Sequence, residues 1–164
     1  MKYLRWFILV GLIVWIASTA QAQLMIKNPN VGKPVPNFKA KTLAGPEKTL
    51  SDFSAGKPTI VFFWATWCPH CRAALKELNK DSEQYAKKGI QIALVDVGEQ
   101  SREVKAYAEK NKVALEIFLD EDETISEKFE IIGVPTFIFV NAAGVIKDVQ
   151  HELPNDYEKI LSTK

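Results

Sequence analysis

Cysteine is scarce in this chain: only two of the 164 residues are cysteines, and both lie in the tetrad Cys68-Pro69-His70-Cys71. A structural disulfide framework in an exported domain uses several cysteines, and a pair that closes so short a loop constrains little of the unfolded chain. We therefore interpret the pair as a redox-active dithiol rather than a structural bridge.

Histidine is equally scarce, with one residue inside the tetrad, His70, and a distant one, His151. A zinc site that used the two cysteines would need two further ligands, which the sequence does not supply near the tetrad. Covalent haem attachment would require a histidine directly after Cys71, and Arg72 stands there. We expect no metal and no dissociable cofactor.

An excess of charge is also lacking, because 21 lysines and arginines face 20 aspartates and glutamates, for a net charge of +1. Nothing in this balance favours a nucleic-acid partner. The length fits one ordinary domain with a core of its own, and the chain shows no internal repeat or low-complexity stretch.

The first residues indicate export. Lys2 and Arg5 precede a mostly apolar run from Trp6 to Ala17, and Ala20-Gln21-Ala22 offers small residues for cleavage, as in a secretory signal peptide. Cleavage after Ala22 would leave 164 − 22 = 142 residues.

We thus expect a signal peptide over residues 1–22, one domain over residues 23–164, and a periplasmic location. The alternative is an uncleaved anchor that holds the domain on the periplasmic side of the inner membrane. That alternative is open because the stretch from residue 3 to residue 20 approaches the ~18 apolar residues of a membrane-spanning helix.

The chemistry of the dithiol depends on its place in the chain. The tetrad follows an apolar run, residues 59–64, and opens a segment with helical periodicity. If Cys68 is the N-cap and Pro69 the first helical residue, the free N–H groups at the helix start stabilise a Cys68 thiolate, the form that attacks disulfides. Cys71, one turn later, can reach back and resolve a mixed disulfide, and His70 can add positive charge.

The remaining pattern predicts an α/β fold. Strands are expected at residues 58–65, 90–97, 115–119, 136–141 and 145–149, with helices at 69–88, 101–110, 123–129 and from about 155. Residues 38–43 and 49–50 are expected to form an N-terminal hairpin, followed by a helical turn at 51–53. The strand at 58–65 lacks alternation, so it belongs in the centre of a mixed sheet that has helices on both faces. Cys71 falls on the apolar stripe of its helix and should be less exposed than Cys68.

Two separate motifs resemble the thioredoxin superfamily: Trp64-Ala65-Thr66-Trp67-Cys68-Pro69-His70-Cys71 and Gly133-Val134-Pro135-Thr136. The segments 32–38, 95–99 and 118–120 are similar to the TlpA/ResA group of exported thioredoxin-like proteins, and the similarity spans about residues 31–150. The resemblance implies a thioredoxin-like fold and thiol–disulfide oxidoreductase activity.

The resemblance also implies roles for residues outside the tetrad. Pro135 would be a cis-proline that faces the dithiol, Val134 and Thr136 would offer backbone groups to an extended substrate, and Trp67 would form a flat contact surface beside the cysteines. The partners would be protein thiols or disulfides and a second redox protein, either dissolved or in the membrane, that regenerates the site. No long extra segment suggests a dimerisation arm, so we expect a monomer.

Two departures from the family pattern suggest the direction of the reaction. Phe62 stands where thioredoxins have a buried aspartate, and Ala74 stands where ResA-like proteins have a glutamate. Losing both carboxylates should make Cys68 more acidic and its disulfide more oxidising. The Pro69-His70 pair, which matches the dipeptide of the oxidant DsbA, indicates the same.

We therefore expect an oxidising or isomerising role, with a reductase, for example in cytochrome c maturation, as the main alternative. A peroxidase is a further alternative, although Ala65 replaces the threonine that peroxiredoxins place three residues before their reactive cysteine. A non-catalytic binding module is the last one.

Overall fold

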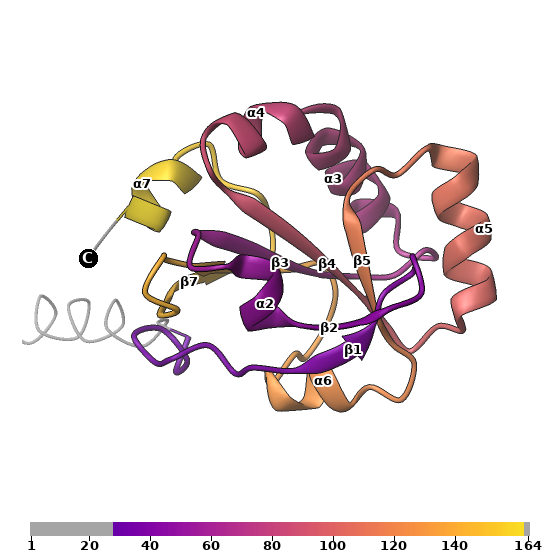
Figure 1. Cartoon of the computed structure of the whole chain (residues 1–164), viewed down its shortest axis with the longest axis horizontal. Coiled ribbons are helices and arrows are strands. Elements are labelled where there is room, and N and C mark those ends of the chain that lie inside the picture. The colour runs from indigo at the N-terminus through magenta and orange to yellow at the C-terminus, as the bar shows by residue number, and fades with distance from the viewer. Residues whose placement is uncertain (1–27, 163–164) are drawn as a thin grey trace, which may run out of the picture.

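A five-stranded mixed sheet forms the centre of the protein, for which a computed structural model describes residues 28–162 (Figure 1). Its strands are β3 (Thr59–Trp64), β4 (Gln91–Val97), β5 (Glu116–Asp120), β6 (Thr136–Val140) and β7 (Ile146–Gln150). They lie in the order β5-β4-β3-β6-β7, with β3 parallel to β4 and antiparallel to β6. Every residue of β3 is buried, so the prediction of a central strand is confirmed. The expected signal segment lies outside the described residues.

Helices cover both faces of this sheet, as predicted. They are α2 (Leu50–Ser54), α3 (Pro69–Lys80), α4 (Ser82–Lys87), α5 (Ser101–Asn111), α6 (Thr124–Lys128) and α7 (Tyr157–Ser162). Because side chains alternate along β3, Phe62 and Trp64 pack with α3 and α5 on one face, whereas Val61 and Phe63 pack with α2 and α6 on the other. Figure 1 shows α3 and α4 above the sheet and α2 and α6 below it. Within residues 28–162, no helix is long and apolar enough to span a membrane.

The predicted N-terminal hairpin is confirmed as a separate two-stranded sheet of β1 (Lys39–Lys41) and β2 (Glu47–Thr49). The chain around it contacts both edges of the main sheet. On β7, the Gly32 N–H donates to the Ile146 carbonyl oxygen over 2.7 Å, and on β5, the Leu43 N–H donates to the Ile117 carbonyl oxygen over 2.8 Å. The segment from residue 32 to residue 43 therefore crosses one face of the sheet from edge to edge.

The expectation of one helix over residues 69–88 is wrong, because the chain forms two helices that meet at Asp81. Asp81 leaves helical geometry (φ −98°, ψ 11°) and begins the second helix, in which the Tyr85 N–H donates to the Asp81 carbonyl oxygen. The change of direction buries Tyr85 against the ring of Tyr157, with 5.1 Å between ring centroids. The last helix begins at Tyr157 rather than near residue 155.

Candidate functional site

The two cysteines lie at the start of α3, directly after β3, and form a disulfide with 5.2 Å between their Cα atoms. Cys68 is the N-cap residue, and its sulfur accepts the Cys71 backbone N–H over 3.2 Å. Pro69 is the first residue of the helix. The predicted cap is thus confirmed. Cys68 is 4% exposed and Cys71 is fully buried, in the predicted order.

The surface around Cys68 is partly apolar. Pro69 and His70 are exposed, and Trp67 is 68% exposed. Ile132, at 103% exposure, is the other large apolar side chain that stands free among residues 28–162. The sequence analysis did not single out Ile132. Its position directly before the motif Gly133-Val134-Pro135-Thr136 could have marked it as part of the surface around the dithiol.

The second motif faces the dithiol. The Val134–Pro135 peptide bond is cis, as the resemblance implied, and the Val134 carbonyl oxygen lies 3.9 Å from the Cys68 sulfur. Thr136 donates its hydroxyl to the Gly133 carbonyl oxygen over 2.7 Å. The His151 Nδ1 lies 2.9 Å from the Pro135 carbonyl oxygen, which can only accept, so this nitrogen carries the proton and donates it. His151, which we considered only as a metal ligand, therefore supports the cis-proline loop.

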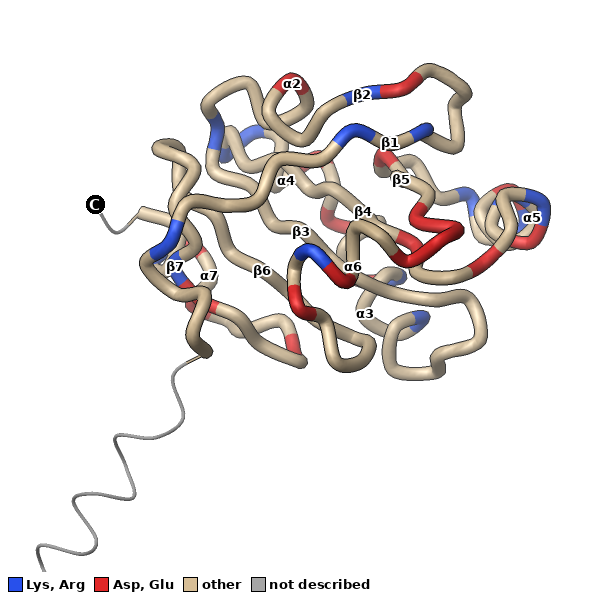
Figure 2. The backbone as a smooth tube through the Cα atoms, turned by 90° about the horizontal axis from the view of Figure 1, so that it is seen from below, with Lys and Arg blue, Asp and Glu red and all other residues tan. Residues whose placement is uncertain are grey.

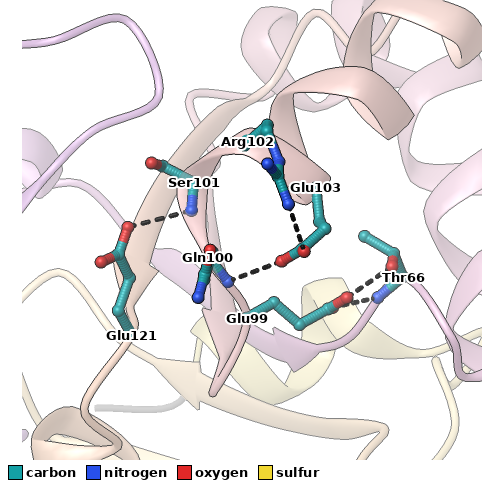
Figure 3. Close-up of polar contacts among 7 residues, drawn as sticks. All are labelled: Thr66, Glu99, Gln100, Ser101, Arg102, Glu103 and Glu121. Atoms are coloured by element: carbon teal, nitrogen blue, oxygen red, sulfur yellow. Dashed lines mark hydrogen bonds and ion pairs between the residues drawn. The ribbon is translucent and has the colours of Figure 1, made fainter.

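A carboxylate holds the turn that leads into the tetrad. Glu99 accepts the Thr66 backbone N–H with one oxygen and the Thr66 hydroxyl with the other, each over 2.5 Å (Figure 3). Gly98, at φ +73°, turns the chain after β4, and a Cβ there would lie 2.9 Å from a Glu123 oxygen. Only glycine suits this position without strain, and the turn places Glu99 opposite Thr66.

Other carboxylates gather near this turn, where β4 and β5 end and α5 begins (Figure 2). Asp96, on β4, is fully buried and is the register partner of Trp64 on β3. Burial raises the pKa of Asp96 to about 9, and the nearby negative charge of Glu99 adds to the shift. No hydrogen bond of good geometry joins either Asp96 oxygen to another described group. Sequence reasoning also missed Asp96 and Glu99, although acids at the carboxyl end of a strand beside β3 were a signal.

Phe62 and Ala74 occupy the two positions where the related proteins have carboxylates, and the structure places both side chains in or beside the core. The Phe62 ring is fully buried and stacks on Phe137, with 4.3 Å between centroids and 6° between planes. Ala74 is half-buried on α3. In the described part of the chain, no three histidine, cysteine or acidic side chains gather in a way that could hold a metal ion.

Comparison with known sequences identifies the group to which this site belongs. The profile of the AhpC/TSA family matches residues 31–149. The chain belongs to this family. This chain is 30% identical over 119 residues to thiol-disulfide oxidoreductase ResA of Geobacillus kaustophilus, and the match covers 73% of this chain and 68% of the relative. It is 31% identical over 147 residues to thiol:disulfide interchange protein DsbE of Yersinia pestis, across 85% and 75% of the two chains.

Solved structures of thioredoxin-like proteins agree on the fold. The thioredoxin domain of a thiol-disulfide oxidoreductase from Bacteroides vulgatus superposes with a TM-score of 0.71 at 27% identity, over 82% of this chain and all of that one (100%). A thioredoxin-family thiol:disulfide interchange protein from Chlorobium tepidum gives a TM-score of 0.68 at 27% identity, over 78% and 92%. This AhpC/TSA protein is a thiol–disulfide oxidoreductase with a thioredoxin-like fold and a Cys68–Cys71 site.

Proposed function

We propose that this oxidoreductase works in the periplasm and exchanges disulfides with protein partners, with a bias towards oxidising or isomerising them. Cys68 is the sulfur that forms the mixed disulfide, Cys71 is the resolving cysteine, and His70 favours the Cys68 thiolate. One observation carries the direction: Cys68 caps a helix of 12 residues, and its sulfur accepts the N–H of Cys71. A bond of this kind is stronger to a thiolate than to a disulfide sulfur, so it stabilises the reduced form and makes the disulfide more oxidising.

The oxidising reaction proceeds in two exchanges. A substrate thiolate attacks the Cys68 sulfur, the Cys68–Cys71 bond breaks, and Cys71 leaves with the electron pair and takes up a proton. A second substrate thiolate then attacks the substrate sulfur of the mixed disulfide and expels Cys68 as a thiolate. The substrate loses two electrons and two protons and gains a disulfide. Cys71 holds one of these protons and the other goes to solvent, so the reduced enzyme carries a Cys71 thiol and a Cys68 thiolate.

The substrate surface that we propose surrounds Cys68. Trp67 supplies an exposed ring on one side. On the other side, the backbone groups of Val134 and Thr136, on either side of the cis-proline, would pair with an extended chain. Ile132 adds a second exposed apolar side chain beside this loop. The arrangement suits a polypeptide with apolar residues near its cysteine, and one copy of the enzyme suffices for it, so we expect a monomer.

Glu99 gives the reductase alternative its specific support. Its carboxylate binds Thr66, two residues before Cys68, and so brings negative charge towards the sulfur. Such a charge disfavours a thiolate, which would lower the reduction potential of the couple. From Phe62 and Ala74 we expected no carboxylate near the dithiol. The fold instead brings acids close to it from β4 and from the loop that follows β4.

The reduction potential of the Cys68/Cys71 couple, equilibrated against glutathione at pH 7, decides between the two directions. A value of about −120 to −180 mV would place the couple among oxidants and isomerases. A value of about −250 mV or below would make the protein a reductase and would refute the oxidising role.

Export is tested separately. We propose cleavage after Ala22, on the strength of the basic and apolar N-terminal pattern. Mass spectrometry of the protein from a periplasmic extract should then find an N-terminus at Gln23. An intact N-terminus in the membrane fraction would instead establish the anchored form, and retention in the cytoplasm would refute export.

A further inference from the structure

Asp96 is a buried acid that the exchange reaction described above does not use. It lies near the carboxyl end of β4 and pairs in register with Trp64 of β3, so both side chains project from the same face of the sheet. Trp64 belongs to the buried cluster that contains Cys68 and Cys71. Asp96 therefore sits on the dithiol's side of the sheet, at the end of the sheet where α3 begins.

Asp96 differs from the three acids around it in having no donor. Glu99 accepts two hydrogen bonds from Thr66, and Asp120 accepts the backbone N–H groups of two residues at the start of α6. Glu103 accepts the backbone N–H of the residue before α5. Both Asp96 oxygens are buried and accept no N–H or hydroxyl of another described residue, and the one side chain that pairs with the Asp96 carboxyl is the carboxyl of Glu99, which raises its pKa. If one acid of this group keeps a proton, it is the one without donors, because a buried charge without partners is costly.

The groups that face Asp96 offer little to offset its charge. Burial raises the pKa of Asp96 most, followed by the negative charge of Glu99 and a side-chain hydrogen bond with it, and the charges of Asp120 and Glu103 add to the shift. On the α5 side, the Tyr107 ring packs against Trp64, with 5.5 Å between centroids. The positive charge of Arg72, on α3, acts on the Tyr107 hydroxyl and is not among the groups that shift Asp96.

We propose that Asp96 tunes the dithiol, because its buried carboxyl and the Cys68 thiol compete to be ionised at the same end of the sheet. The oxidised site carries no charge on its sulfurs. Its reduction breaks the S–S bond and adds two electrons, and Cys71 takes up one proton while Cys68 remains a thiolate. That thiolate makes ionisation of Asp96 harder, and by linkage an ionised Asp96 makes the thiolate less favourable. Asp96 acts through the field at Cys68 and is a tuning residue rather than a catalytic one.

The coupling appears only in alkaline solution, where Asp96 begins to ionise. Near pH 7 its carboxyl is neutral in both redox states, and an asparagine in its place changes little at the sulfurs. Above about pH 9 the oxidised enzyme loses the Asp96 proton before the reduced enzyme does. Reduction then takes up one extra proton, so the reduced form becomes less favourable than it is without Asp96. This inference concerns the same site as the proposed function but does not depend on its oxidising direction.

The direct test follows the Asp96 carboxyl carbon by NMR in full-length protein labelled with ¹³C-aspartate, oxidised and reduced, from pH 6 to 10. We expect Asp96 to titrate at alkaline pH when oxidised and about half a pH unit higher when reduced, a threefold change in its acid dissociation constant. Ionisation already at pH 7, or the same titration in both redox states, would overturn the proposal. This comparison needs no variant, so it stands even if a substitution impairs folding.

Variants give an independent readout, the redox equilibrium constant against glutathione from pH 7 to 10. Asp96→Asn should match the wild type at pH 7 and favour the reduced form by about threefold over it at pH 10. Glu103→Gln removes a like charge from an exposed position of the same group and should follow the wild type at both pH values. Parallel curves for wild type and Asp96→Asn, or an equal effect of Glu103→Gln, would refute the role of Asp96. A reducing potential at pH 7 would refute the oxidising role and leave this coupling intact.

Discussion

Replacing Asp96 by asparagine should change how the stability of the fold depends on pH. Burial raises the pKa of Asp96 from 3.8 to about 9, so the folded protein holds a proton that the unfolded chain releases above about pH 4. Between these values unfolding releases a proton and becomes easier as the pH rises. The stabilisation from this group is complete below the unfolded pKa and is lost as the pH rises to the folded one.

The size of the effect follows from the same shift. Each pH unit in this window lowers the free energy of unfolding by about 1.4 kcal/mol, so by pH 7 the ionisable carboxyl has cost about 4 kcal/mol. Asparagine cannot ionise, but its buried amide oxygen receives no donor from the described residues, at a cost of about 1–3 kcal/mol. We expect Asp96→Asn to be more stable than the wild type at pH 7 by about 1–3 kcal/mol.

Urea unfolding of the oxidised proteins, followed by tryptophan fluorescence at pH 5, 6.5 and 8, measures this difference. The advantage of Asp96→Asn should grow by about 4 kcal/mol between pH 5 and pH 8. Asp122→Asn is the matched control, because hydrogen bonds from Thr124 lower the pKa of this exposed acid and its effect belongs to acidic pH. If the curves of Asp96→Asn and wild type run parallel, Asp96 is not the buried neutral acid described above.

Three further predictions concern the site. Cys71→Ser should leave Cys68 joined to substrate in a mixed disulfide that is visible on non-reducing gels, and free enzyme alone would contradict the assigned resolving role. Glu99→Gln should destabilise the active-site turn by about 1–3 kcal/mol in urea unfolding, because charge-assisted bonds are lost, and unchanged stability would show that the turn holds without them. Trp67→Ala and Ile132→Ser should each raise KM for a reduced protein substrate and leave exchange with glutathione unchanged, whereas equal losses on both substrates would indicate damage to the dithiol itself.

Local patterns were enough to predict the central strand and the start of α3. The run of apolar residues that forms β3 predicts a buried strand by itself. Cys68 followed by Pro69 is a typical N-cap and first helical residue, so the tetrad alone predicts where α3 begins. The cis bond at Pro135 came from the family resemblance, because most X-Pro bonds are trans and nothing local distinguishes this one.

The acids beside the dithiol could not be predicted in this way. Asp96 lies next to Trp64 only because β3 and β4 pair in one particular register, and strands so far apart in sequence carry no local mark of their pairing. Glu99 reaches Thr66 only because Gly98 turns the chain at the end of β4. The break at Asp81 was missed for a related reason, since the packing of Tyr85 against the distant Tyr157 decides it.

The residues that cross the sheet from β7 to β5 also determine when the fold can close. Unpaired strand edges can form hydrogen bonds with other chains. In this protein residues 32–43 cover the two edge strands of the main sheet, β7 and β5. Residues 32–43 are synthesised before either strand that they cover, and they would also cross the membrane first in the proposed export. The β5 edge can be covered as soon as β5 is available. The β7 backbone comes more than a hundred residues after Gly32, so that edge stays open to other chains until the last strand of the sheet has followed.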